Sequence, residues 1–168
     1  TAGLHFTDQL MRDLRKTGVE IIFATLDIGW GTFRPISAEN IHDHKMDSEE
    51  FLLHDSAAKT INKAKAEGRR VISVGTTCVR LLESNIKEHR VESNYIVGHG
   101  AGSTNLFITP GHQFKIIDGL VSNFHLPKST LLLLVSALIG KENLFKTYNH
   151  AVDNGYRFYS FGDAMLMI

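Results

Sequence analysis

The chain has 168 residues, of which 43% are apolar, and its 18 basic and 18 acidic side chains give a formal net charge of zero. This length is enough to bury one sizeable hydrophobic core, so we expect a single domain over residues 1–168. A neutral chain has no global electrostatic attraction for nucleic acid or for a membrane surface, so either partner would need a local recognition feature. The lone cysteine, Cys78, excludes an intrachain disulfide framework and is typical of a reducing, cytoplasmic setting.

Helix and strand patterns alternate along the chain. Helical periodicity predicts helices over 5–17, 55–67, 79–87, 131–139 and 142–154. Runs of apolar and β-branched residues predict strands over 19–28, 51–54, 70–74, 105–109, 114–121 and 156–161. Such alternation predicts an α/β sandwich, a three-layer Rossmann-like domain with a largely parallel sheet. The apolar run 131–139 is far shorter than the roughly 20 residues that span a bilayer, which predicts a core helix.

Polar side chains gather between the predicted strand that ends at Val121 and the predicted helix that begins at Leu131. They are an amide, a histidine, an ammonium group and two hydroxyls, from Asn123, His125, Lys128, Ser129 and Thr130. Open α/β sheets bind ligands where a strand passes into a helix. Pro127 suits a first helical turn, because its missing N–H would be unbonded there anyway, and the next N–H groups would then be free for an anion. We therefore predict a ligand site at 122–130.

A second candidate site is the turn 75–77, Gly-Thr-Thr, between a buried strand and a helix. Backbone N–H groups and threonine hydroxyls at a helix N-terminus suit a carboxylate or a phosphate, and Arg80 could add a bidentate hydrogen-bonding partner. A structural interpretation stays equally open, in which the threonines cap the helix and Arg80 pairs with Glu83 three residues further on.

Two loops allow weaker interpretations. The glycine-rich loop 29–35 could pass close to a ligand and stack Phe33 on a planar base, although a tight turn with a buried indole explains the same residues. The segment 42–49 is rich in potential metal ligands, and in an extended backbone His42 and His44 would face the same side. Surface loops often collect such residues, so we predict no metal site.

Aromatic residues alternate around Arg157 near the end of the chain and could present stacking faces beside a cation. Alternation in a half-buried strand explains the same pattern by packing alone. Asp163 is the stronger candidate, because an acidic residue at the end of a strand reaches the ligand-binding edge of a sheet.

Several longer strings resemble the S-adenosylmethionine:tRNA ribosyltransferase-isomerase family of queuosine biosynthesis. They are TAGLHFT, GWGTFRPI, HDHKMDSE, VGTTCVRLLES, LFITPGHQFKIIDGLVSNFHLPKSTLLLLVSALIG and YRFYSFGDAMLMI, in this order. The resemblance covers essentially the whole chain, and SNFHLPKSTL with YRFYSFGDAML is its most specific part. Two positions depart from the family pattern, because Asp27 and Asp47 stand where the family commonly has histidines.

The resemblance implies an enzyme that transfers the ribosyl part of S-adenosylmethionine to 7-aminomethyl-7-deazaguanine at the wobble position of tRNA. Isomerisation then gives epoxyqueuosine, and adenine and methionine leave. The chain would be the C-terminal part of a larger two-domain enzyme, without the family's inserted β-barrel. Its partners would be tRNA and S-adenosylmethionine in the cytoplasm, with no further cofactor, no metal and no membrane, and we expect a monomer.

The chemical steps of this ribosyl transfer suggest roles for the candidate residues. A sulfonium acidifies the adjacent 5′ carbon, so the reaction needs a base, an acid for the departing adenine and a partner for the methionine carboxylate. We predict that His125 transfers the proton, because the ordinary pKa of histidine lies near physiological pH. Arg80 with the 75–77 turn would hold the carboxylate or a tRNA phosphate, and Asp163 would hold a ribose hydroxyl or orient the amine. The other predicted substrate-binding residues are His5, Phe33, Gly75, Thr76, Thr77, Asn123, Lys128, Ser129 and Arg157.

Two interpretations from other functional classes stay open. A metal-dependent hydrolase would use His42 and His44 as ligands. A non-catalytic RNA-binding module would bind tRNA without S-adenosylmethionine and with a steep salt dependence.

Overall fold

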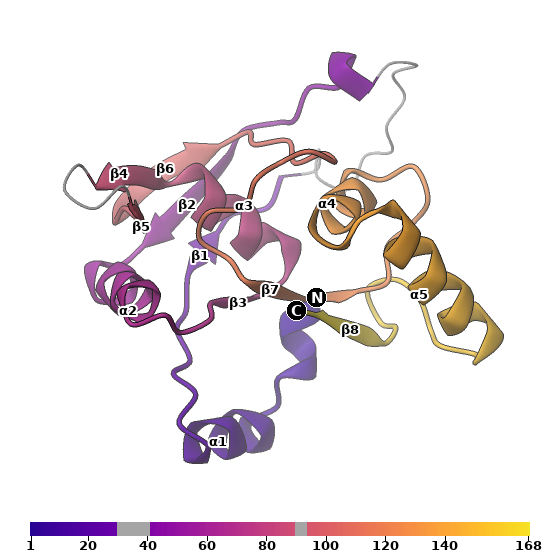
Figure 1. Ribbon diagram of the computed structural model, residues 1–168, viewed down its shortest axis with the longest axis horizontal. Coiled ribbons are helices and arrows are strands. Elements are labelled where there is room, and N and C mark those ends of the chain that lie inside the picture. The colour runs from indigo at the N-terminus through magenta and orange to yellow at the C-terminus, as the bar shows by residue number, and fades with distance from the viewer. Residues whose placement is uncertain (30–40, 90–93) are drawn as a thin grey trace.

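Figure 1 shows the computed structural model of the chain, which describes residues 1–29, 41–89 and 94–168. Its α-helices are α1 (Asp8–Lys16), α2 (Asp55–Ala66), α3 (Thr76–Ser84), α4 (Thr130–Ile139) and α5 (Lys141–Asp153). Its strands are β1 (Thr25–Leu26), β2 (Glu49–Leu53), β3 (Ile72–Val74), β4 (Ile86–His89), β5 (Asn94–Val97), β6 (Gly100–Thr104), β7 (Gly119–Asn123) and β8 (Ala164–Met167). Short 3₁₀-helices are η1 (Ala2–His5) and η3 (Ile41–Asp43).

The strands form small sheets that are mostly antiparallel. β2 is antiparallel to both β1 and β6, and β4 and β5 form a separate antiparallel pair. In the remaining sheet, ordered β3-β7-β8, β7 is parallel to β3 and antiparallel to β8. The prediction of a three-layer Rossmann-like domain with a largely parallel sheet is therefore wrong. The chain has a mixed α/β fold, in which only β3 and β7 pair in parallel among the strands of the described ranges.

The glycines near residue 100 explain part of this error. Glycine disfavours strands, so the sequence predicts a loop there and a strand over 105–109. The structure instead pairs β6 with β2, and residues 105–109 form no strand. Gly102 lies opposite Phe51, and a Cβ atom on Gly102 would be 2.6 Å from Phe51 Cζ. The missing side chain makes room for the phenyl ring, which permits the antiparallel pairing.

Three other predicted strands are wrong over most of their length. In segment 19–28 only β1 pairs, and Phe23 is 68% exposed. Of the segment 114–121, only the residues from Gly119 onward belong to a strand. Residues 156–161 lie in a loop, and the last strand begins at Ala164. Apolar content predicts burial, but it does not determine where the backbone hydrogen-bond partners of a segment lie.

The helices follow the predictions more closely. α2, α4 and α5 confirm three predicted helices with small differences at their ends, and α3 ends earlier than expected because β4 follows it. α4 begins at Thr130, after Ser129, whose hydroxyl accepts a hydrogen bond from the Leu132 N–H at 3.2 Å. Pro127 lies in the turn before this cap and not in the first turn of the helix.

The apolar run 131–139 confirms the prediction of a core helix, because it forms most of α4 and buries Leu134 and Val135. In the parts of the chain that the structure describes, no helix has the length and apolar character needed to cross a bilayer.

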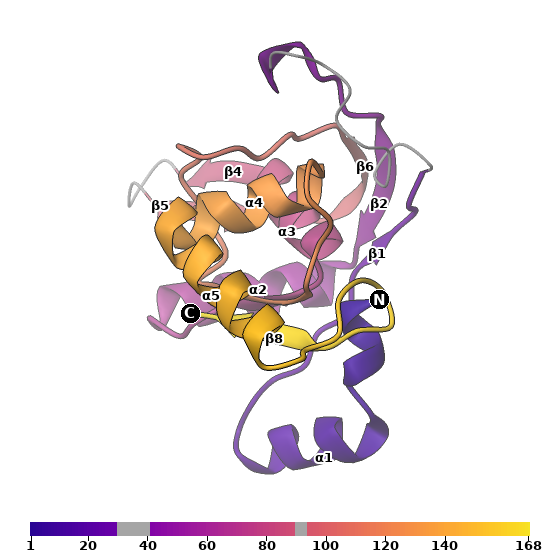
Figure 2. The same cartoon turned by 90° about the vertical axis from the view of Figure 1, so that its right-hand side faces the viewer.

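α3 lies at the centre of the molecule, between the sheet of β1, β2 and β6 and the helices α4 and α5 (Figure 1). It contacts strands of both three-stranded sheets. The buried core includes Leu53, Val79, Leu81, Leu120 and Val135. α1 stands apart from this core in both views (Figures 1 and 2), and it buries none of its residues.

Two buried charged residues fix the position of α3. Arg80, only 2% exposed, forms an ion pair with Glu49 of β2, and its Nε donates to the Leu106 carbonyl at 3.0 Å. The Glu83 carboxylate accepts hydrogen bonds at 2.9 to 3.0 Å from the three backbone N–H groups of residues 115–117. Buried charges are tolerated only when they are paired or hydrogen-bonded. The pair and the carboxylate therefore hold α3 against β2 and against the segment that leads into β7.

Removal of the Glu83 carboxylate is expected to destabilise the fold strongly. Glu83→Ala leaves three N–H groups, two of them fully buried, without their acceptor, which should lower the free energy of unfolding by about 3 kcal/mol. Glu83→Gln keeps one acceptor oxygen and should cost less. Urea unfolding measures both, with the exposed Glu50→Ala on β2 as control. A Glu83→Ala variant as stable as this control would show that the Glu83 hydrogen bonds do not stabilise the position of α3.

Candidate active site

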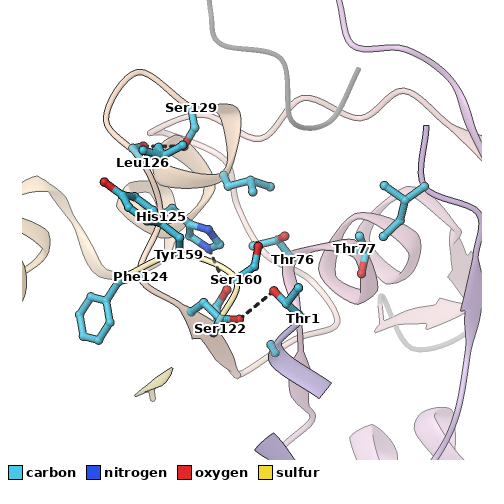
Figure 3. Close-up of a pocket in the computed structure, with 15 residues that line it drawn as sticks. Thr1, Thr76, Thr77, Ser122, Phe124, His125, Leu126, Ser129, Tyr159 and Ser160 are labelled. Carbon is cyan, nitrogen blue, oxygen red and sulfur yellow. Dashed lines mark hydrogen bonds between the residues drawn. The ribbon is translucent and has the colours of Figure 1, made fainter. Parts of the chain in front are cut away.

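A pocket of about 130 Å³ lies where β3 and β7 end (Figure 3). The two strands are parallel, with Val74 opposite Val121, so their carboxyl ends meet at the same edge of the sheet. The Gly75 N–H donates to the Val121 carbonyl at 2.8 Å and continues the pairing beyond β3. Gly75 has a φ of +87°, a left-handed conformation that favours glycine. The 75–77 turn and the segment after β7 therefore become the two walls of one pocket.

Four parts of the chain supply most of the lining. They are Thr1 and Ala2, residues 75–77 at the start of α3, residues 122–126 with Ser129 and Leu131, and Tyr159 with Ser160. Ile28 completes the lining, and the residues that follow Gly29 lie outside the described ranges.

His125 is the histidine among the described residues of this lining. Its Nε2 lies 2.8 Å from Ser122 Oγ, and its backbone N–H donates to the Tyr148 hydroxyl at 2.8 Å (Figure 3 shows the contact with Ser122). Burial lowers the pKa of His125 to about 4. Burial raises the pKa of Tyr148 to about 12. His125 is therefore a neutral imidazole at physiological pH, and its Nδ1 has no hydrogen-bond partner in the described parts of the chain.

Asn123 connects three of the segments around the pocket. Its Oδ1 accepts a hydrogen bond from Thr1 Oγ1 at 3.0 Å, and its Nδ2 lies 3.1 Å from His5 Nε2 and 3.5 Å from the Gly162 carbonyl. The Asn123 side chain is almost completely buried, at 3% exposure. It thereby joins the start of the chain and the loop before β8 to the end of β7.

The loop 157–163 presents Tyr159 and Ser160 to the pocket. The Tyr159 N–H donates to the Phe124 carbonyl at 2.9 Å, and Tyr159 has a φ of +72°, which is uncommon for a residue other than glycine. Arg157 and Asp163 close the loop, since Asp163 accepts hydrogen bonds at 2.8 Å from both the backbone N–H and the guanidinium of Arg157. The side-chain hydrogen bond from Arg157 lowers the pKa of Asp163.

Six of the predicted site residues line the pocket, and most of the others lie elsewhere in the described structure. Those that line the pocket are Gly75, Thr76, Thr77, Asn123, His125 and Ser129. His5 lies behind the pocket, next to Asn123. Arg80 is buried against Glu49, Lys128 is exposed in the turn before α4, and Arg157 and Asp163 pair with each other. Phe33 lies outside the described residues.

Some residues of the pocket were not predicted as site residues. Ser122 is the partner of His125, Tyr159 and Ser160 form part of the lining, and Tyr148 supports His125 from α5. Ser122 lies inside the predicted ligand segment 122–130, although it is not among the individually predicted site residues. Tyr148 follows His125 by 23 residues, and no sequence signal connects the two.

The geometry of the described residues does not support the alternative interpretation of a metal site. The ring centroid of His44 lies 5.1 Å from that of Phe107, and its Nε2 is buried without a hydrogen-bond partner. The side chain of His42 is outside the described part of the structure. Among described residues, no group of three or more His, Cys, Asp or Glu could hold a metal ion. Asp27 and Asp47 are both exposed.

Comparison with known proteins identifies relatives over the whole chain. A family model described as "Queuosine biosynthesis protein" matches residues 1–167. Proteins named S-adenosylmethionine:tRNA ribosyltransferase-isomerase are 55% identical in Heliobacterium modesticaldum and 51% identical in Treponema denticola, in both cases over 100% of this chain. The chain covers 48% and 47% of those relatives, so it spans about half of their length.

A solved structure agrees with this assignment. The crystal structure of S-adenosylmethionine tRNA ribosyltransferase from Thermotoga maritima superposes with a TM-score of 0.79 at 39% identity, covering 100% of this chain and 52% of the other. Sequence and fold therefore match the same group of proteins from end to end, and the chain belongs to the queuosine biosynthesis protein family.

Proposed function

We propose that the protein carrying this chain transfers the ribosyl part of S-adenosylmethionine to 7-aminomethyl-7-deazaguanine in tRNA and isomerises it to epoxyqueuosine. Adenine and methionine are the other products. Family membership supports the reaction, because relatives that carry the name of this activity are 51% to 55% identical over the whole chain. The substrates are then S-adenosylmethionine and the wobble position of a cytoplasmic tRNA, with no cofactor beyond S-adenosylmethionine.

The proposed mechanism rests on one observation, the neutral His125 that lines the pocket. The reaction needs a base near the 5′ carbon, whose hydrogens the adjacent sulfonium makes acidic. His125 offers an imidazole lone pair, and because one ring nitrogen contacts Ser122, the other is the nitrogen available to a substrate. An imidazolium would repel the sulfonium of the substrate. The low pKa of His125 therefore suits a cationic ligand, and burial is its main cause.

The remaining candidates act around this centre. Ser122 orients the imidazole through the 2.8 Å contact with Nε2. Asn123 positions the start of the chain and the loop 157–163. Asp163 acts through that loop, because its carboxylate is engaged by Arg157.

The size of the pocket limits what the described residues can enclose. Sites for small molecules usually have volumes of about 300 Å³ or more, whereas this pocket has about 130 Å³. The described lining therefore encloses one part of S-adenosylmethionine. Ile28 lies in this lining, and residues 30–40 are outside the described ranges.

Loss of the imidazole is expected to abolish most of the activity. In the natural-length protein, His125→Gln should lower the rate of adenine release from S-adenosylmethionine about 100-fold or more, in the presence of tRNA that carries the aminomethyl base. The exposed His150→Gln on α5 is the matched control and should retain the wild-type rate.

A His125→Gln rate within about threefold of wild type would remove His125 from the proton transfer. Wild-type protein that binds tRNA but releases no adenine would favour a non-catalytic RNA-binding module instead.

The buried histidine also predicts how stability depends on pH. The pKa of His125 is about 4 in the folded chain against an ordinary 6.5, so the unfolded chain binds more protons between these values. The contribution of neutral His125 is fully present above pH 6.5 and is lost as the pH falls toward 4. Between pH 7 and pH 5 it amounts to about 2 kcal/mol.

Urea unfolding at the two pH values measures this contribution. The loss of stability on acidification should be smaller by that amount in His125→Gln, whereas the exposed His54→Gln should behave as wild type. Equal pH dependence in wild type and His125→Gln would contradict a buried neutral histidine.

A further inference from the structure

The first turn of α3 presents backbone donors that no group in the chain occupies. Residues 76–78 begin the helix, and none of their N–H groups has an acceptor in the described ranges. The first N–H of this helix with a partner is that of Val79, which donates to the Gly75 carbonyl at 3.4 Å. The N-cap position is Gly75, which has no side chain to satisfy these donors. The helix dipole adds a partial positive charge at the same place.

An independent feature points to a ligand at this end of the helix. Thr76 is 6% exposed, and its hydroxyl has no hydrogen-bond partner among the described residues. Thr76 lines the pocket, where Figure 3 shows it beside Ser160. The Thr76 hydroxyl therefore borders the pocket without a partner in the described part of the chain, and a ligand or a water can satisfy it. The hydroxyl and the free N–H groups thus converge on one small volume.

The chemistry of the lining selects an anion. Among the described residues, the lining contains no Asp, Glu, Lys or Arg side chain, and the polar groups at the start of α3 are N–H and O–H donors. Such donors stabilise an oxyanion without a counter-charge. A terminal carboxylate fits, and S-adenosylmethionine has one.

We infer that the first turn of α3, with the Thr76 hydroxyl, binds the carboxylate of the methionyl part of S-adenosylmethionine. This inference rests on the proposed function, because it takes the substrate from it. Arg80 is not needed for this contact, since its guanidinium forms the ion pair with Glu49 in the core. The carboxylate would be held at the end of β3, and the sulfonium would then extend toward His125 at the end of β7.

Calorimetry with two ligands tests the inference. In the natural-length protein, Thr76→Val keeps the shape of the side chain and removes its hydroxyl. S-adenosylmethionine should bind this variant about tenfold more weakly than wild type. Decarboxylated S-adenosylmethionine, which lacks the carboxylate, should bind wild type and Thr76→Val equally. Thr60→Val on α2, whose hydroxyl donates to the Ser56 carbonyl at 3.0 Å, is the matched control and should change neither affinity.

A second variant separates a local effect from misfolding. Thr76→Ser keeps the hydroxyl and should restore most of the affinity for S-adenosylmethionine. Equal losses for both ligands in Thr76→Val, or equal affinity of wild type for both ligands, would overturn the carboxylate site. Those results would leave the proposed function intact wherever adenine release continues. Wild-type protein that neither binds S-adenosylmethionine nor releases adenine would overturn both.

Discussion

The parallel pairing of β3 with β7 is the constraint on which the site depends. Its register places Val74 opposite Val121, and the Gly75 N–H extends the pairing to the point where α3 begins. Two segments that are about fifty residues apart in the sequence therefore end side by side. The fold as a whole is not a parallel α/β sandwich, yet the candidate pocket lies at the carboxyl ends of two parallel strands, where open α/β sheets bind ligands. The glycine at position 75 makes it possible, because its φ of +87° turns the chain from the strand into the helix.

Two buried charged residues hold the central helix α3 in place. Arg80 and Glu83 lie on α3 and hold it to β2 and to residues 115–117, respectively. These contacts fix the direction of the helix, and with it the place of its first turn in the pocket. A substrate-binding arginine and a structural arginine have the same sequence signature, a basic residue one turn into a helix that follows a glycine. The difference lies in Glu49, whose position opposite α3 is a property of the tertiary structure.

The sequence predicted local features well and pairings poorly. Helix positions followed from periodicity, and the segment 122–130 was recognisable because polar residues interrupt two apolar runs. Strand order was not accessible, since Gly102 permits β6 only because Phe51 needs the space. The prediction that Asp163 faces a ligand depends on a strand over 156–161. In the structure these residues form a loop, and the Asp163 carboxylate accepts a hydrogen bond from the Arg157 N–H within it. His125 was predicted as a proton-transfer residue from its ordinary pKa, but its burial and its contact with Ser122 depend on the packing of α5 and β7.

The polarity of the pocket fits a substrate that carries both signs of charge. S-adenosylmethionine has a positive sulfonium a few bonds from a negative carboxylate, so a charged side chain that attracts one group would repel the other. Backbone N–H groups and the Thr76 hydroxyl can hold the carboxylate through short-range hydrogen bonds. A neutral His125 likewise adds no charge at the other wall. In this proposal, the lack of Asp, Glu, Lys and Arg side chains among the described lining residues is a functional feature. It lets the helix terminus orient the substrate while the sulfonium keeps its full effect on the acidity of the 5′ carbon that faces the imidazole.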